Sequence, residues 1–600
     1  MKEEKQRRFH ETLLNILYPQ PSSPQRDFSG EEPAATVRDM GIYPYPSLDA
    51  FEDLEEKSSD SSSDSGSHQK KLTRAQRKRI RKKKLKEAAS RRRKMIGPLL
   101  PSTDGIQIEE DNEVEPLNYL HENTNQQISC GAVQEPNAGN NHQVVALSRS
   151  KVRTLPGYQG LLPFQLETGY VNVDESDGVE LFYYFVESER NPKEDPLMLW
   201  LTGGPGCSAF SGLVLETGPL RINDDYSGSG LPSFVLNPYS WTKVSSIIFL
   251  DAPVGSGFSY SSSLLGWNSS DTKSSRQTYI FLRKWLADHP EFNNNPFYLG
   301  GDSYCGITIP IIAKEIADGI SAQHKPLINL KGYLLGNPVT DVHSNDNSKI
   351  LFSHRMALIT DELYELTKRT CKGEYVNVDP KNVECVKNLG AALELIERVN
   401  DNQILEPKCD TTEPNCISDP NNCTIELPLE RRIQGDRRFL GKKLPALLFP
   451  ESECREFNYV SLVYWANDGS VRNALHIRKG SINTWVRCKK DILPLERDVQ
   501  SSLIYHQNLS ARGYRALIYS GDHDKYVSHL GTLAWIKSLN YSIIDDWRQW
   551  LVSGQVAGYT RTYSNRMTFA TVKGGGHTAP EYKPEECLAM IARWLSHNPL

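Results

Sequence analysis

The stretch 296–306, PFYLGGDSYCG, decides the fold because it sets a serine in a sharp turn between a strand and a helix. The apolar run Pro296-Phe297-Tyr298-Leu299 predicts a buried strand, and the residues after Gly306 predict a helix. Glycines and other small residues around Ser303 permit the strained turn that lifts a serine hydroxyl away from the backbone. The backbone N–H of Tyr304 can then donate to a developing oxyanion.

This stretch departs from the usual G-x-S-x-G pattern, because Cys305 holds the fifth position and the glycine follows it. Taken alone, the stretch is also compatible with a plain structural turn. Two later segments favour catalysis: the apolar run 515–520 leads into 521–524 (GDHD), and the run 567–572 leads into 574–577 (GGGH). Serine, aspartate and histidine thus each follow a strand, in the chain order of an α/β-hydrolase.

A fourth segment of the same kind lies upstream of the serine. The apolar strand 197–201 ends in the glycine-rich loop 202–208, TGGPGCS. Bare glycine amides can approach a substrate oxygen closely, so this loop is the natural second half of an oxyanion hole. The sequence therefore predicts an α/β-hydrolase fold with a central, mostly parallel sheet.

These motifs resemble those of plant serine carboxypeptidase-like proteins, the peptidase S10 family, from about Leu155 to the C-terminus. The resemblance is dispersed over the whole of that region and rests on long motifs. The matching segments are LPGY at 155–158, FQLETGY at 164–170, WLTGGPGCS at 200–208, FLDAPVGSGFSY at 249–260, GDSYCG at 301–306, WAND at 465–468, YSGDHD at 519–524 and GGHTAP at 575–580.

The resemblance implies a role for each residue of the predicted site. Ser303 would be the nucleophile, His577 the general base and Asp524 the carboxylate that orients the base, while the N–H groups of Gly204 and Tyr304 would form the oxyanion hole.

One choice within this assignment depends on the family alone. Spacing does not separate Asp522 from Asp524, and the family assigns the second aspartate of G-D-x-D to the triad. The loop then departs from the family pattern, because Lys525 and Ser528 stand where an apolar residue and a proline are common.

Two substitutions bear on the substrate. Carboxypeptidases of this family recognise a peptide carboxylate with an asparagine in W-L-N-G-G and a glutamate in G-E-S-Y, where this chain has Thr202 and Asp302. With Gly203 these two residues are the candidate substrate-binding set. Threonine donates through one short hydroxyl and aspartate is one methylene shorter than glutamate. Thr202 and Asp302 instead resemble the acyltransferase branch, which moves an acyl group from a 1-O-glucose ester to an alcohol acceptor. A carboxypeptidase acting on peptides is the alternative.

The cysteines indicate an oxidising compartment, because nine of the eleven lie within the span from Cys207 to Cys488. The family implies the pairs Cys207–Cys488 and Cys371–Cys385. Cys409–Cys454 is a further candidate, which leaves Cys416 and Cys423 as a local pair. No C-x-x-C motif supports zinc, so we predict no metal and no cofactor. Candidate glycosylation sites are Asn268, Asn422, Asn508 and Asn540.

An inserted cap is predicted over about residues 338–460, with helix-like segments at 361–369 and 389–399. Within it, residues 427–449 are rich in basic residues and proline, which is typical of a surface linker. Some family members lose the corresponding linker by cleavage, so cleavage within 431–443 is a hypothesis. The cap is the expected means of excluding water from an acyl-enzyme.

Residues 1–150 differ from the enzyme domain at 151–600, because they are highly charged and poor in large apolar residues. This composition predicts a disordered extension. Its basic run, Lys70 to Lys94, is compatible with nuclear import, with nucleic-acid binding or with a solvated helix.

The extension also bears on localisation. The disulfides and sequons favour the secretory pathway, with a vacuolar or extracellular destination, yet the first residues contain no apolar signal segment, and no segment is long enough for a membrane span. An upstream segment joined to the enzyme in the gene model would explain this conflict, and a genuine nuclear-targeted fusion is the alternative.

Overall fold

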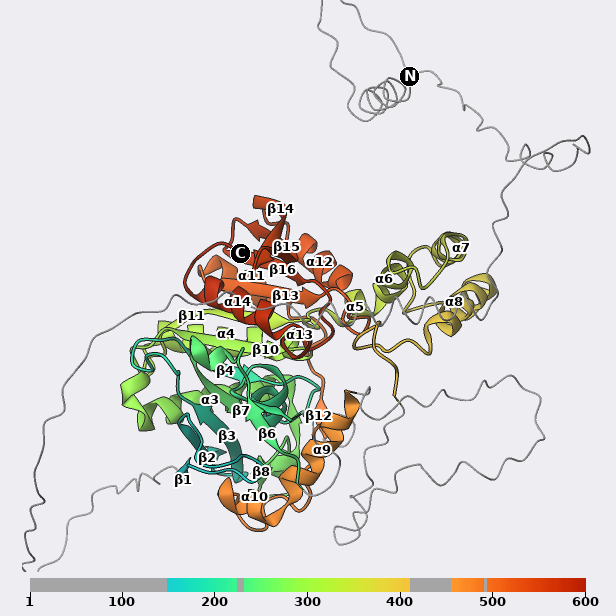
Figure 1. Ribbon diagram of the computed structural model, residues 1–600. Helices are drawn as coiled ribbons and strands as arrows, with labels where there is room; N and C mark the ends of the chain where they lie inside the picture. The colour runs from blue at the N-terminus through green and yellow to red at the C-terminus, as the bar shows by residue number, and fades with distance from the viewer. Residues whose placement is uncertain (1–147, 224–230, 410–454, 490–493) are drawn as a thin grey trace, which may run out of the picture. The chain divides into compact units, whose positions relative to one another are not determined.

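The computed structural model describes residues 148–223, 231–409, 455–489 and 494–600 (Figure 1). The charged extension lies outside the described residues as far as residue 147, and so does its basic run. None of the helices in the described ranges combines the length and the apolar character that crossing a bilayer requires. Further predicted features that lie outside these ranges are Asn422, Cys416, Cys423, Cys454 and the linker 427–449 with its cleavage region 431–443.

A large central sheet organises the described chain, with the strand order β1-β2-β3-β7-β4-β10-β11-β13-β16-β15-β14. The six central strands, β7, β4, β10, β11, β13 and β16, run parallel to one another, and the strands on both flanks pair antiparallel. The predicted mostly parallel sheet is therefore confirmed. The strands are β1 (Ser148–Val152), β2 (Leu166–Asp174), β3 (Val179–Val186), β4 (Leu197–Leu201), β7 (Ser246–Leu250), β10 (Phe297–Asp302), β11 (Leu330–Gly336), β13 (Arg515–Gly521), β14 (Ile543–Val552), β15 (Gln555–Tyr563) and β16 (Met567–Val572).

Helices cover both faces of the parallel strands, which explains why those strands read as continuous apolar runs. In β4 all five residues are buried. The helices are α3 (Asp271–Asp288), α4 (Cys305–Ser321), α9 (Glu456–Asn467), α10 (Gly469–Ala474), α11 (Leu503–Ala511), α12 (His529–Ser538), α13 (Ala579–Tyr582) and α14 (Pro584–Leu595). Successive residues of β4 pack into different cores: Leu199 lies in the core on the face that holds α3, α4 and α12, and Trp200 lies in the core on the face that holds α9 and α14.

Shorter elements connect this framework. Strand β8 (Tyr260–Ser261) pairs with β3, and two small sheets lie outside the main one. The remaining short elements are β5 (Leu220–Ile222), β6 (Phe234–Leu236), β9 (Ser269–Ser270), β12 (Leu495–Glu496), and the helical turns η1 (Gly212–Glu216), η2 (Trp241–Lys243), η3 (Leu265–Trp267) and η4 (Pro290–Phe292).

A helical insertion follows β11 and corresponds to the described part of the predicted cap. It contains α5 (Val342–Asn347), α6 (Lys349–Arg355), α7 (Asp361–Cys371) and α8 (Val383–Ile396). Helix α8 begins six residues before the predicted start at residue 389, because Asn382 caps it by accepting from the N–H of Cys385. In Figure 1, α6, α7 and α8 lie to one side of the sheet.

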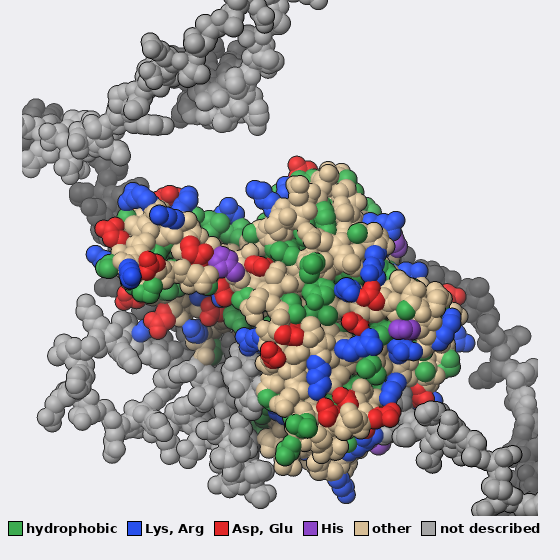
Figure 2. All heavy atoms as spheres, turned by 180° about the vertical axis from the view of Figure 1, so that it is seen from behind, with side chains coloured by type: hydrophobic (Ala, Val, Ile, Leu, Met, Phe, Trp, Pro, Cys, Tyr) green, Lys and Arg blue, Asp and Glu red, His purple; other side chains and the backbone are tan. Residues whose placement is uncertain are grey.

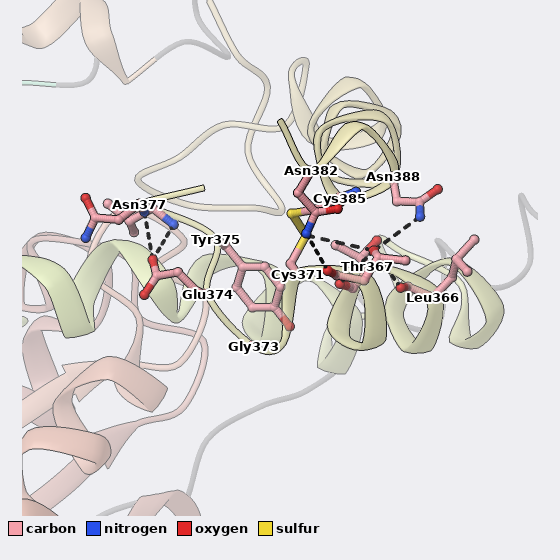
Figure 3. The surroundings of a disulfide bond; sticks show 12 residues. Leu366, Thr367, Cys371, Gly373, Glu374, Tyr375, Asn377, Asn382, Cys385 and Asn388 are labelled. Carbon is pink, nitrogen blue, oxygen red and sulfur yellow. Dashed lines mark hydrogen bonds between the residues drawn. A yellow bond between two sulfur atoms is a disulfide. The ribbon is translucent and has the colours of Figure 1, made fainter. Parts of the chain in front are cut away.

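The hairpin of α7 and α8 is held together close to its turn. The predicted disulfide between Cys371 and Cys385 is present, and Asn382 Nδ2 donates to the carbonyl of Thr370 beside it (Figure 3). The two helices share a small apolar cluster that includes Tyr364 and Ile396. This cluster is separate from the two cores of the sheet, so the hairpin has limited apolar contact of its own and benefits from the crosslink.

Charge is dispersed over the face of the molecule that Figure 2 shows. On the face drawn in Figure 2, basic and acidic side chains alternate and do not gather into a region of one sign. The formal net charge of the whole chain is −5. Long-range attraction of a polyanion needs a concentrated basic field, which this face does not offer.

Candidate active site

Four neighbouring parallel strands bring the predicted site together. Strands β10, β11, β13 and β16 are adjacent in the sheet, and they lead respectively into Ser303, Asn337, Asp524 and His577. Because the carboxyl ends of parallel strands meet at one edge of a sheet, residues more than 270 positions apart along the chain become neighbours. The site is therefore a direct product of the strand order.

The three predicted triad residues form a hydrogen-bonded chain. His577 Nε2 lies 2.8 Å from Ser303 Oγ, and His577 Nδ1 lies 2.8 Å from Asp524 Oδ2. Asp524 is fully buried, and its other oxygen accepts the N–H groups of Tyr526 and Val527. These contacts match the nucleophile, base and carboxylate arrangement that acyl transfer through serine requires.

The choice between the two aspartates of the GDHD loop is visible in their contacts. Asp522 Oδ1 accepts the N–H of Gly574 at 2.6 Å and so braces the glycine turn before His577. Asp524 is the aspartate that contacts the imidazole. Asp522 thus stabilises the loop, and Asp524 is the partner of the histidine.

Ser303 has the strained backbone that the elbow requires. Its φ is +56°, in the left-handed region that residues with a side chain rarely adopt. The turn is held by two backbone hydrogen bonds, from Ser303 N to Gly336 O and from Val339 N to Ser303 O, each 2.9 Å long. Backbone hydrogen bonds to the segment that follows β11 therefore hold Ser303 in the conformation that exposes its hydroxyl group.

The glycine-rich loop after β4 lies against this elbow. A Cβ on Gly203 would stand 2.7 Å from Ser303 Cβ and 2.8 Å from Tyr304 N, so only glycine fits there. The next residue, Gly204, has a φ of +115°, which also favours glycine. The two predicted oxyanion donors, the amides of Gly204 and Tyr304, are thereby carried on segments in direct contact.

Two further restraints hold the oxyanion loop. The predicted disulfide between Cys207 and Cys488 is present and spans 281 residues of sequence. The fully buried carboxylate of Asp251 accepts Ser208 Oγ and Ala209 N on one oxygen and Phe258 N on the other. Burial raises the pKa of Asp251 to about 6, while these hydrogen bonds oppose the rise.

The imidazole of His577 titrates above its ordinary range. Burial lowers the pKa of His577, but the charge of Asp524 and its hydrogen bond outweigh burial, and Asp302 adds to them, so the net shift is upward. Arg487 acts in the opposite direction. The neutral imidazole, which can take a proton from Ser303, therefore predominates only at a pH above the ordinary histidine value.

The predicted substrate-binding residues lie beside the elbow. Asp302 Oδ1 accepts the N–H of Gly203 at 3.0 Å, so part of its short side chain is already engaged. Burial raises the pKa of Asp302, against the opposing influence of His577 and this amide. Thr202 is 8% exposed, and its hydroxyl has no hydrogen-bond partner among the described residues.

Several charged residues near the site were not predicted from the sequence. Burial raises the pKa of Glu216, and the nearby carboxyl groups of Asp302 and Glu581 raise it further. Trp200 Nε1 donates to Glu216, and Thr578 donates to Glu581. Glu581 follows His577 by four residues, so its position near the site could have been predicted from the sequence. Glu216 lies in the helical turn η1, and no motif indicated that it would lie near the site.

The remaining candidates have different surroundings. Asn268 and Asn540 are exposed, whereas Asn508 is half-buried within α11. Cys409 forms a disulfide. Cys305 and Cys587 are free and buried. Within the described ranges, no cluster of three or more histidine, cysteine, aspartate or glutamate side chains is suited to a metal ion.

Known proteins resemble this chain over the whole described enzyme domain. The serine carboxypeptidase family model matches residues 156–597. Serine carboxypeptidase-like 7 of Arabidopsis thaliana is 51% identical over 453 residues, which cover 76% of this chain and 94% of the relative. Serine carboxypeptidase-like 12 of the same plant is 50% identical over 461 residues, 77% of this chain and 97% of the relative.

A solved structure supports the fold independently. Kex1(delta)p, a prohormone-processing carboxypeptidase from Saccharomyces cerevisiae, superposes with a TM-score of 0.55 at 20% identity, over 72% of this chain and 91% of that protein. The predicted α/β-hydrolase architecture is thereby confirmed. A family match that covers the sheet from β2 onward, the described cap helices and every strand end of the site leaves one assignment: this chain belongs to the serine carboxypeptidase family and is a serine carboxypeptidase-like enzyme.

Proposed function

We propose that this enzyme is an acyltransferase, which moves an acyl group from a 1-O-glucose ester to an alcohol through an acyl-enzyme on Ser303. The observation that carries the proposal is the state of the two residues beside the elbow. Asp302 is engaged by the Gly203 amide, and Thr202 offers one short hydroxyl. Neither reaches a peptide carboxylate as the longer glutamate and the asparagine amide of family carboxypeptidases would.

The first half-reaction follows from the hydrogen-bonded chain. Ser303 Oγ attacks the ester carbonyl carbon, and its proton moves to His577 Nε2, 2.8 Å away. The amides of Gly204 and Tyr304 stabilise the oxyanion. The bond from the carbonyl carbon to the glucose C1 oxygen then breaks, and that oxygen takes the proton from Nε2, so free glucose departs.

The second half-reaction runs in the opposite sense with a different alcohol. The acceptor hydroxyl gives its proton to His577 Nε2 and attacks the acyl carbonyl carbon. The ester bond to Ser303 breaks, and Oγ regains a proton from the imidazole. No net oxidation occurs and no cofactor is needed, since one ester is exchanged for another.

A carboxypeptidase is the second candidate, and one observation favours it. Burial raises the pKa values of Glu216 and Asp302, and the carboxyl groups of Asp302 and Glu581 raise that of Glu216 further. A protonated carboxyl group can donate a hydrogen bond to a carboxylate, so this pair retains some capacity to bind a peptide C-terminus. Substrate choice then depends on whether that capacity survives the shortened Asp302.

We also propose a secretory location, which the disulfides Cys207–Cys488 and Cys371–Cys385 and the exposed sequons at Asn268 and Asn540 support. Edman sequencing of the mature plant protein tests this. A start near Leu155 supports secretion after removal of the extension, whereas retention of the basic run 70–94 supports a nuclear or nucleic-acid-associated form.

The decisive experiment compares acyl transfer with peptide hydrolysis in the same preparation. The full chain, expressed behind a secretion leader, is incubated with 1-O-acylglucose esters and a panel of alcohols and, separately, with blocked dipeptides. Ser303→Ala is the blank. Transfer to an alcohol that vanishes in the blank supports the proposal; release of C-terminal amino acids at the higher rate overturns it in favour of the carboxypeptidase.

A further inference from the structure

A short segment that returns from the cap lies along the loop of the triad aspartate. This segment, residues 400–406, follows α8 and is called here the return segment. The carbonyl of Asp401 accepts the N–H groups of both Lys525 and Tyr526, each at 2.9 Å. The N–H of Ile404 donates to the carbonyl of His523 at 3.2 Å. The return segment is thus bonded to the backbone on both sides of Asp524.

The return segment also contacts the loop of the triad histidine. The N–H of His577 donates to the carbonyl of Asn402 at 2.7 Å, and Gln403 Nε2 donates to the carbonyl of Gly574 at 3.1 Å. A Cβ on Gly576 would stand 2.5 Å from the oxygen of Asn402. Movement of the return segment would therefore displace the backbone of His577 itself.

One side chain fastens this segment to the end of the cap helix. Lys525 is 5% exposed, and its Nζ lies 2.8 Å from Asp401 Oδ1 and 3.0 Å from the carbonyl of Ile396, the last residue of α8. A buried ammonium group is costly unless it is paired, so Lys525 holds these two partners in place. An apolar side chain at this position would leave the carbonyl and the carboxylate without that partner.

The same loop contacts the start of the cap. Ser528 Oγ lies 2.7 Å from the hydroxyl of Ser348, which joins α5 to α6. Ser528 also caps α12 by accepting from Gly531 N. Lys525 and Ser528 are the two positions where this loop departs from the family pattern, and both contact the insertion, one where it begins and the other where it returns.

We propose that Lys525 is a positioning residue that couples the cap to the triad, because it locks the return segment against the loops of both Asp524 and His577. It touches neither the substrate nor the reacting atoms and acts through Asp401 and Asn402. The inference rests on the proposed serine chemistry and holds for acyl transfer and peptide hydrolysis alike, since both need the same aligned triad.

The coupling predicts a kinetic effect that a local ion pair would not have. In Lys525→Met the loosened return segment no longer fixes His577, so Ser303 becomes a poorer nucleophile. We expect the labelling rate of Ser303 by a fluorophosphonate, and kcat for a small ester, to fall about ten-fold with little change in KM, the size of effect that a misaligned catalytic group produces.

Further variants of the full chain distinguish a loss of coupling from a general loss of stability. Asp401→Asn changes a half-exposed side chain, keeps the backbone hydrogen bonds and should lower the labelling rate of Ser303 by a smaller factor than Lys525→Met does. In the double variant with Lys525→Met, Asp401→Asn should add little to the loss. Lys525→Arg, which can donate to both partners, should restore most of the rate. Lys314→Met, which breaks an ion pair with Asp318 on α4, is the control and should leave the rate unchanged.

Hydrogen exchange supplies a readout that needs no activity. The amides of His577 and Ile404 should exchange faster in Lys525→Met, whereas a purely local ion pair would change only the peptide that contains residue 525. Unchanged labelling and unchanged exchange at His577 would overturn the proposal. If the wild-type protein itself resists labelling, the proposed serine chemistry has failed instead, and the exchange result still decides the coupling.

Discussion

Asn337 Nδ2 donates to Asp524 Oδ2 at 2.7 Å, the same oxygen that pairs with the imidazole of His577. Asn337 is fully buried, follows β11 and also accepts the N–H of Gly521. Oδ2 of Asp524 is therefore held by two partners, His577 and Asn337. The strand that Asn337 follows, β11, lies in the sheet between β10, which leads into the serine, and β13, which leads into the aspartate. The geometry of the triad therefore depends on the end of β11 as well as on the ends of β10, β13 and β16.

Removing the Asn337 side chain should weaken catalysis. Its φ of +41° favours asparagine or glycine, so Asn337→Gly removes the hydrogen bonds without adding backbone strain. Loss of a bond to a charged group costs about 1.5–3 kcal/mol, and we expect kcat/KM for an ester to fall at least about ten-fold. Asn295→Gly, at a buried asparagine that donates to Pro192 and Asp195 carbonyls, is the matched control. Equal losses in both variants would contradict the prediction.

The pH dependence of Ser303 reactivity should follow the raised pKa of His577. Only the neutral imidazole accepts the serine proton, so reactivity is present at high pH and is lost as pH falls through the folded-state pKa. Because Asp524 and Asp302 raise that pKa against the influence of burial and Arg487, the midpoint should lie above 6.5. Fluorophosphonate labelling rates between pH 5 and 9 measure it, and a midpoint below 6.5 would show that burial dominates.

Asp251→Ala should damage the oxyanion loop and the stability of the protein together. The change leaves three buried donors, on Ser208, Ala209 and Phe258, without their acceptor, at a cost of about 3 kcal/mol or more. We expect a lower Tm and a lower kcat. Asp195→Ala, which removes another buried acceptor of Ser188 and Asn191, should lower Tm while sparing kcat. An unchanged kcat in Asp251→Ala would disconnect this carboxylate from the oxyanion loop.

The two described disulfides should differ in their effect on catalysis. Serine replacements of Cys207 and Cys488 free the oxyanion loop from a crosslink that spans 281 residues, so both stability, by about 2–5 kcal/mol, and kcat should fall. The same replacements at Cys371 and Cys385 open a crosslink of 14 residues within the α7–α8 hairpin and should leave the labelling rate of Ser303 near that of the wild type. A comparable loss of labelling in both would refute the distinction.

Reversing the two substitutions near the elbow should change the substrate preference. Thr202→Asn together with Asp302→Glu restores a side-chain amide and a longer carboxyl group beside Glu216 and Gly203. Each regained bond to a charged group is worth about 1.5–3 kcal/mol, so hydrolysis of blocked dipeptides should rise at least about ten-fold. Product analysis by mass spectrometry follows both activities. A double variant with unaltered peptide hydrolysis would mean that carboxylate recognition lies elsewhere.

Much of the fold could be predicted because each piece of it is local. The apolar runs at 197–201 and 567–572 coincide with β4 and β16 as observed, since a strand buried on both faces needs an unbroken apolar run. Glycines at Gly203 and Gly204 were conspicuous because a side chain there would collide with the elbow or strain the backbone. The order of serine, aspartate and histidine loops was equally readable, as was the pairing of the two described disulfides through the family.

Only the tertiary structure decided which distant groups meet. Asp522 and Asp524 are two residues apart and chemically alike, and only the direction in which each leaves β13 assigns one to Gly574 and the other to His577. The sequence indicated no partner for Asn337, Asp251 or Lys525, because their partners lie 187, 43 and 129 residues away in sequence. The sequence by itself determined the chemistry at each strand end, through local backbone and residue type; the order of the strands, which no single segment encodes, determined that those ends form one site.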